Sequence, residues 1–242
     1  MRINGTDITS LVSDSIQFLD YTLPPPSFTR QVTISDGDTK IVNKRETLGI
    51  NNIQVRLVMY ADKDDSYIMA SKLVSLLGEA YVDFYGDLVY RVTIATDGGL
   101  ELLSEEMFLY TMQLQVLEKL GDEVEIITTS ANPIVLPNVG TYKTPILIEV
   151  TPTTSIASFS VYGFGAHTSA TPLVVNLPVI NKKTIIDGVD KQILQEVSAG
   201  VYENKFASTN LISFPVIPSG GTTLTFSPTN LNITIRYNPR YI

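Results

Sequence analysis

The sequence lacks cysteine and tryptophan and has one histidine among its 242 residues. Without cysteine there is no disulfide framework, no thiol nucleophile and no thiolate metal site. A single histidine excludes a two-histidine zinc or iron site within one chain, and any Ser-His-Asp arrangement would have to use His167. Without tryptophan the strongest surface for stacking a sugar or a cation is missing, although 12 Tyr and 9 Phe are present.

Basic residues are also few. The chain has 17 Lys and Arg against 25 Asp and Glu, which gives a formal net charge of -8. Because a protein that wraps nucleic acid needs clustered Lys and Arg, this composition argues against that class. The N-terminus lacks the long apolar segment of a signal peptide, and no stretch approaches the ~18 apolar residues of a membrane-spanning helix. We therefore expect a chain made in a cytoplasm.

The charge is unevenly distributed along the chain. Residues 1–130 hold 20 acidic and 10 basic residues, a net charge of -10, whereas residues 131–242 hold 5 and 7, a net charge of +2. Between these halves the segment 128–140, TTSANPIVLPNVG, has two prolines, one glycine and no charge. Such a composition is typical of a linker. We predict two domains, 1–132 and 133–242.

Strand patterns dominate both halves. Apolar and polar residues alternate over 53–59, 88–94 and 108–116, the period-2 pattern of half-buried antiparallel strands. The second half has shorter alternating runs, at 146–150, 159–161, 224–226 and 231–237. Turn signals such as Asp187-Gly188 separate them. Frequent short strands with Gly and Pro between them favour a β-sandwich over a parallel α/β sheet.

One segment, 62–78, has a helical pattern. Its apolar residues recur at i, i+3, i+4 and i+7: Ala70, Leu73, Val74 and Leu77. Asp62 or Asp64 can cap the start of a helix, and Gly78 stands where a helix commonly ends. The sequence therefore predicts one helix, about 62–78, in an otherwise β domain.

The acids Asp62, Asp64 and Asp65 resemble a calcium loop at first sight. Counted from Asp62, however, the positions at which an EF-hand needs Gly and Glu hold Tyr67 and Leu73. Acidic residues are also favoured at the positive end of a helix dipole. We therefore interpret the cluster as a helix N-terminus and predict no metal site.

Two further candidates for catalysis are the adjacent Glu105 and Glu106 and the single histidine. Glycosidase carboxylates flank the scissile bond, whereas neighbours on one strand point to opposite faces, so this pair is interpreted as a polar loop before the strand at 108–116. His167 lies in GFGAHTSATP without a nearby motif that would orient it, and we expect a solvent-exposed loop residue. No phosphate-binding loop or nucleophile elbow occurs. We predict no catalytic residue and no bound cofactor.

The remaining candidates are aromatic. Most Tyr and Phe residues, Tyr90 and Phe108 among them, fall on the apolar faces of predicted strands and are interpreted as core. Tyr162 and Phe164, in a Gly-rich segment, and Tyr202 are candidates for contacts with a partner or a sugar.

The order of these features resembles the distal tail proteins (Dit) of long-tailed phages that infect Gram-positive hosts. Segment 43–78, NKRETLGINNIQVRLVMYADKDDSYIMASKLVSLLG, resembles a strand and the helix of that family's N-terminal domain, and 85–119 resembles the paired strands that follow. GTYKTPILIEVTP at 140–152 resembles the first strand of its galectin-like C-terminal domain, and 198–226 its closing hairpin region. One departure is that Gly221 is followed by Thr222, where the family often has Gly-x-Asn.

The resemblance implies a mainly β fold: an N-terminal β-sandwich with one α-helix, the ring or belt domain, and a C-terminal galectin-like β-sandwich. It implies a non-enzymatic structural protein of the virion, assembled in the host cytoplasm into a hexameric ring at the tail tip or baseplate. Its implied partners are the tail tube protein, the tail-associated lysin or hub protein and, in some relatives, a receptor-binding protein. DNA passes through such a ring without specific binding, and no membrane insertion is implied.

Two physical expectations accompany the resemblance. An acidic channel would let DNA pass without trapping it, so the acids of residues 1–130 are candidates for lining it, although the same acids are also typical of an ordinary solubilising surface. A closed ring needs two different complementary faces on each subunit, for which edge strands near 32–34 and 41–48 are the candidates.

Other interpretations remain open at this point. A carbohydrate-binding module would contact cell-wall saccharide through Tyr162, Phe164 or Tyr202, although a galectin-type site would need the missing tryptophan. A hydrolase would use Glu105 or Glu106. A tail tube subunit would usually have one sandwich and no second, near-neutral domain.

Overall fold

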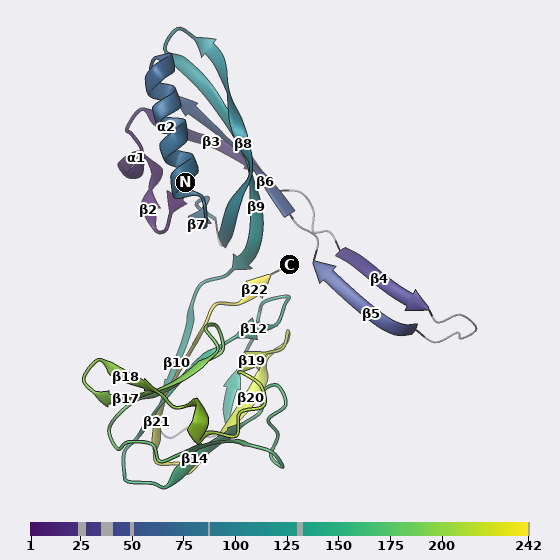
Figure 1. Ribbon diagram of the computed structural model, residues 1–242, viewed down its shortest axis with the longest axis vertical. Helices are drawn as coiled ribbons and strands as arrows, with labels where there is room; N and C mark the ends of the chain where they lie inside the picture. The colour runs from purple at the N-terminus through teal and green to yellow at the C-terminus, as the bar shows by residue number, and fades with distance from the viewer. Residues whose placement is uncertain (24–27, 35–40, 49–50, 87, 130–132, 242) are drawn as a thin grey trace. The chain divides into compact units, whose positions relative to one another are not determined.

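The computed structural model describes residues 1–23, 28–34, 41–48, 51–86, 88–129 and 133–241. In these residues the chain is mainly β, with antiparallel sheets and two α-helices, which confirms the predicted fold class. The chain divides into two compact units, Met1–Leu120 and Gly121–Tyr241 (Figure 1).

The first unit is built on an antiparallel sheet with the strand order β2-β1-β7-β8-β9-β6-β3. The bounds are β1 Arg2–Ile3, β2 Thr6–Asp7, β3 Ile16–Thr22, β6 Asn51–Met59, β7 Ala80–Asp83, β8 Val89–Ser104 and β9 Met107–Leu120. Two further strands, β4 (Phe28–Ile34) and β5 (Ile41–Leu48), pair with each other as a separate antiparallel hairpin.

Alternation along the strands determines which side chains fill the core. In β6 the residues Ile53, Val55, Leu57 and Met59 are all buried, and the intervening Gln54 and Arg56 are exposed. The same alternation along β9 buries every second residue from Phe108 to Leu114. The three strands predicted in this half are therefore confirmed: 53–59 and 108–116 lie within β6 and β9, and β8 covers 89–94 of the predicted 88–94.

The predicted helix is confirmed as α2, Lys63–Leu76. Asp62 is its N-cap, and its carboxylate accepts a hydrogen bond from the backbone N–H of Asp65 at 2.9 Å. The helix buries Met69, Ala70 and Leu73 in the same core as the sheet, and Figure 1 shows it lying along β8 and β9. A short helix that the sequence analysis did not predict, α1 (Ile8–Leu11), follows β2.

The second unit is a sandwich of two antiparallel sheets. One has the order β10-β21-β13-β16-β17-β18 and the other β11-β20-β14-β15, with β12 and β19 paired separately. The bounds are β10 Val124–Thr128, β11 Ile134–Leu136, β12 Thr144–Pro145, β13 Leu147–Pro152, β14 Ser158–Tyr162, β15 Leu173–Asn176, β16 Thr184–Asp187, β17 Gln192–Ser198, β18 Val201–Asn204, β19 Val216–Ile217, β20 Thr222–Ser227, β21 Leu231–Tyr237 and β22 Arg240–Tyr241. A short 3-10 helix, η1 (Phe206–Ser208), follows β18. The alternating apolar residues of both sheets share one core, as predicted for 146–150, 159–161, 224–226 and 231–237.

The division between the units lies at Leu120 and not near residue 132. The reason is that β10 pairs along its whole length with β21, so residues 124–128 belong to the second sandwich. The uncharged segment at 128–140, part of which lies outside the described residues, is thus internal to the second unit. With this division, residues 1–120 hold 17 acidic and 10 basic residues, a net charge of -7, and residues 121–242 hold 8 and 7, a net charge of -1.

Candidate functional site

The two acidic motifs of the first unit lie at a helix N-terminus and in a turn between strands. Asp62 caps α2, while Asp64 and Asp65 lie exposed in its first turn, where the helix dipole favours them. Glu105 and Glu106 form the exposed turn between β8 and β9, which confirms the interpretation as a polar loop. Within the described part of the chain, no cluster of three or more potential metal ligands occurs.

His167 is not the exposed loop residue that we expected, since only 1% of its surface is accessible. Its Nε2 accepts hydrogen bonds from the backbone N–H groups of Ile212 and Ser213, at 3.2 and 3.4 Å, and its Nδ1 lies 3.2 Å from the carbonyl oxygen of Thr171. Because Nε2 accepts, Nδ1–H is the donor of the hydrogen bond to the carbonyl oxygen of Thr171. These hydrogen bonds connect the loop that contains His167 and Thr171 to the segment Ile212–Ser213. Since both ring nitrogens are engaged, neither is free for proton transfer.

The three candidate aromatic contacts do not converge. Phe164 is 3% exposed and packs in the core of the second unit, so its ring is not available at the surface. Tyr162 is half-buried on β14, on the face opposite the buried Phe159 and Val161. Tyr202 lies exposed on β18, which belongs to the other sheet. A shared aromatic platform for a saccharide is therefore not formed by these residues.

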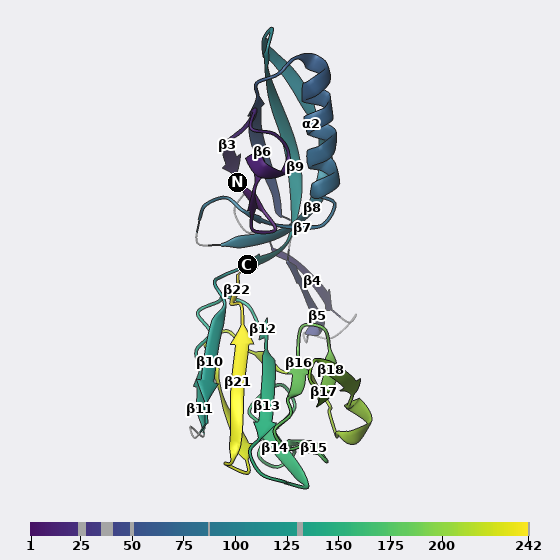
Figure 2. The same cartoon turned by 90° about the vertical axis from the view of Figure 1, so that its left-hand side faces the viewer.

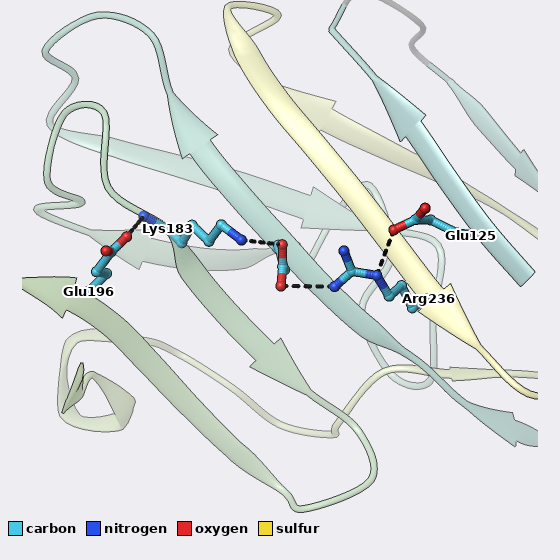
Figure 3. Close-up of polar contacts among 5 residues, drawn as sticks. Glu125, Lys183, Glu196 and Arg236 are labelled. Carbon is cyan, nitrogen blue, oxygen red and sulfur yellow. Dashed lines mark hydrogen bonds and ion pairs between the residues drawn. The ribbon is translucent and has the colours of Figure 1, made fainter. Parts of the chain in front are cut away.

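A row of five charged residues crosses the outer face of the larger sheet of the second unit (Figure 3). Arg236 on β21 contacts Glu125 on β10, with Nε 2.6 Å from Oε1, and Glu149 on β13, with Nη1 3.1 Å from Oε1. The other oxygen of Glu149 accepts from Nζ of Lys183 at 3.0 Å, and the backbone N–H of Lys183 donates to Glu196 on β17 at 3.3 Å. We call these five residues the charge ladder.

The charge ladder connects strands that are distant in sequence, and Figure 2 shows β10, β21 and β13 side by side. The hydrogen bond that Arg236 donates to Glu125, followed by the charge of Glu149, raises the pKa of Arg236 above its ordinary value. Because most of these side chains are exposed, each ion pair contributes at most about 1 kcal/mol to folding. The five charges sum to -1, and their contacts link neighbouring strands of the sheet.

A polar cluster that the sequence did not reveal lies at the start of the first unit. Asp7 accepts from the hydroxyl of Tyr85 at 2.5 Å and from the backbone N–H and hydroxyl of Thr9 at 3.0 and 2.9 Å. The Tyr85 hydrogen bond, with those from Thr9, lowers the pKa of Asp7 to about 2. The guanidinium of Arg2 lies over the Tyr85 ring, 5.6 Å from its centroid. An aspartate before a helix can be recognised in the sequence as a possible N-cap. Its hydrogen bond with Tyr85 cannot, because the two residues are 78 positions apart.

No protein-family model and no curated protein sequence matches the chain. Solved structures do match. The Dit protein of phage SPP1, described as a paradigm of the hub adsorption apparatus of phages that infect Gram-positive bacteria, aligns with a TM-score of 0.73 at 16% identity, over 99% of this chain and 98% of that one. The chain has the Dit fold.

Two further matches, with lower TM-scores, come from the baseplate of phage p2 in its activated conformation. The structure with Sr aligns with a TM-score of 0.51 at 9% identity, over 93% of this chain and 91% of that one. The structure with Ca aligns with a TM-score of 0.52 at 9% identity, over 94% and 91%. At these identities the likeness establishes the Dit fold, and function has to be argued separately.

Proposed function

We propose that this protein is a structural, non-enzymatic subunit of a phage tail tip, in the position that Dit holds in SPP1. The observation that carries the proposal is the match to SPP1 Dit over 99% of the chain, which includes both units in the same order. The places of the candidate catalytic residues support it. Glu105 and Glu106 occupy an exposed turn, and both nitrogens of His167 are engaged inside the second unit.

In this proposal six copies form a ring that joins the tail tube protein to the tail-associated lysin or hub protein, with a receptor-binding protein as a further partner of the second unit. A closed ring of this symmetry requires a donor face and a different acceptor face on each copy. The β4–β5 hairpin, which covers the predicted edge strands at 32–34 and 41–48, is the candidate donor. It supports this role because it pairs with no other strand among the described residues, and an unpaired strand edge can accept a strand of another chain.

We further propose that acids of the first unit line the channel for DNA. Its net charge of -7, against -1 for the second unit, favours passage of a polyanion without adhesion. The ring would belong to the virion. Among the described helices none is long and apolar enough to cross a membrane.

Electron microscopy of the purified chain tests the proposed assembly. We expect ring-shaped end views with six-fold symmetry and an open centre. Titration with cell-wall saccharide tests the alternative of a carbohydrate-binding module in the same sample. A structural subunit gives no saturable binding, whereas saturable binding by particles without a ring would favour the alternative.

A further inference from the structure

A groove runs between α2 and the hairpin formed by β8 and β9. Its outer part encloses about 500 Å³ and is lined by Lys63, Tyr67, Leu100, Leu102, Glu105 and Phe108. An inner part of about 230 Å³ shares Tyr67 and Leu100 with it and continues between the helix and the sheet. Figure 1 shows α2 lying along the two strands, with its first turn toward their connecting turn. We call this feature the α2–hairpin groove.

The lining of the groove is mostly apolar and partly open to solvent. Phe108 forms a buried part of the lining, whereas Tyr67 is 54% and Leu102 62% exposed. Ile68, next to Tyr67 on the helix, is also exposed. Large apolar side chains gathered around a concave surface lose contact with water when another apolar side chain enters, which favours binding.

Acidic residues of the first unit stand beside the residues that line the mouth of this groove. Asp62, Asp64 and Asp65 stand at the start of α2, and Glu105 and Glu106 at the turn of the hairpin, all exposed. Both elements border the same opening, because Lys63 and Glu105 both line it. Five carboxylates against the single lysine give a local net charge of -4.

These carboxylates are available to a partner. Only Asp62 is engaged, through its cap of α2. Asp64, Asp65, Glu105 and Glu106 take part in no ion pair among the described residues. An apolar pocket with an acidic mouth is complementary to a cationic segment that carries an apolar side chain.

We propose that the α2–hairpin groove binds a segment of a partner protein in which large apolar side chains are flanked by Lys or Arg. The segment's apolar side chains enter between Tyr67 and Leu102, and its basic residues face Asp64 and Glu105. The proposal deepens the proposed function, on which it rests for the partner being another tail-tip protein. The acidic mouth disfavours an occupant of net negative charge, DNA included.

The test uses the full-length chain and a labelled peptide in which Phe-Leu stands between two Lys-Lys pairs. Two comparison peptides carry Glu in place of Lys, or Ser in place of Phe-Leu. We expect saturable binding of the first peptide alone, with amide NMR shifts concentrated at Tyr67, Leu100 and Leu102. Equal binding of the Glu-flanked peptide, shifts elsewhere, or no binding by the first peptide would overturn the proposal.

Matched variants separate the two parts of the recognition. Leu102→Ser should weaken the peptide about tenfold because it removes apolar contact, whereas Leu177→Ser, an equally exposed change in the second unit, should have no effect. The pair Asp64→Asn and Glu105→Gln should lower the association rate and its dependence on salt. The pair Asp122→Asn and Glu123→Gln removes the same charge in the second unit and should leave both unchanged.

Assembly of the same variants distinguishes this proposal from the proposed function. Leu102→Ser chains should form the same oligomer as the unmodified chain while losing the peptide. An oligomer lost on Leu102→Ser would mean that the groove contacts a neighbouring copy, which contradicts the proposal. If the unmodified chain forms no ring but binds the peptide as described, the proposed binding site is supported and the proposed ring is contradicted.

Discussion

His167 shows how one side chain can hold two loops in place. Its ring accepts from two backbone N–H groups and donates to a carbonyl oxygen, and its centroid lies 5.0 Å from that of Phe164. Removing it leaves the N–H groups of Ile212 and Ser213 without their acceptor and opens a cavity at a buried position.

We therefore predict that His167→Ala lowers the free energy of unfolding by about 2–4 kcal/mol. Urea unfolding followed by circular dichroism measures the loss, and the exposed Ser169→Ala in the same loop is the control, expected within about 0.5 kcal/mol of the unmodified chain. If both variants changed the free energy of unfolding by a similarly small amount, the hydrogen bonds of His167 would not stabilise the fold.

The Asp7–Tyr85 pair makes a prediction about pH. The folded-state pKa of Asp7, about 2, is below its ordinary value of 3.8, so the contribution to stability is present above about pH 4 and is lost as the pH falls through 2. Tyr85→Phe removes the main cause, and the pKa of Asp7 should rise toward 3.8. A carboxyl-carbon NMR titration reads this midpoint directly. An unchanged midpoint in the variant would contradict the role of the tyrosine hydroxyl.

At the scale of the element, the stability of α2 depends on Asp62, the N-cap residue that precedes its first turn. We predict that Asp62→Ala lowers the free energy of unfolding of the chain by about 1 kcal/mol, because the N–H of Asp65 loses its acceptor. Asp64→Ala removes the same charge from the first turn without removing the cap and should cost less than half as much. Thermal unfolding of both variants tests the difference, and equal losses would assign the effect to charge alone.

The elements were predictable where their signals are local. The alternation in 53–59 and the helical spacing after Asp62 each depend on residues within one turn or strand, and the structure confirms both. The burial of His167 depends instead on Ile212, 45 residues away, and its Gly-rich neighbourhood is typical of an exposed loop. A single sequence carries no local sign of such a contact.

The predicted domain boundary near residue 132 differs from the observed one after Leu120 for a related reason. A segment with proline and without charge indicates a loop, but it does not show which unit the strand before it belongs to. The pairing of β10 with β21 joins Glu125 to Arg236 across 111 residues and assigns that strand to the second unit. The charge ladder could not be predicted from the sequence either, because its members come from strands of one sheet that are far apart in the sequence.

At the scale of the whole molecule, the charge contrast between the units remains after the boundary is corrected, at -7 and -1. The Dit fold was predictable from the order of strands, helix and second sandwich, and the likeness to SPP1 Dit bears it out. The acidic mouth of the α2–hairpin groove was not predictable, since Lys63 of α2 and Glu105 of the hairpin line one opening only through the packing of these two elements.

The central claim is that this chain assembles into a ring at the tail tip. Native mass spectrometry of the purified protein, over a range of concentrations, tests it most directly. The account predicts a discrete hexamer of the 26.6 kDa chain that persists on dilution. A strict monomer at every concentration, also in the presence of its tail tube and hub partners, would contradict it.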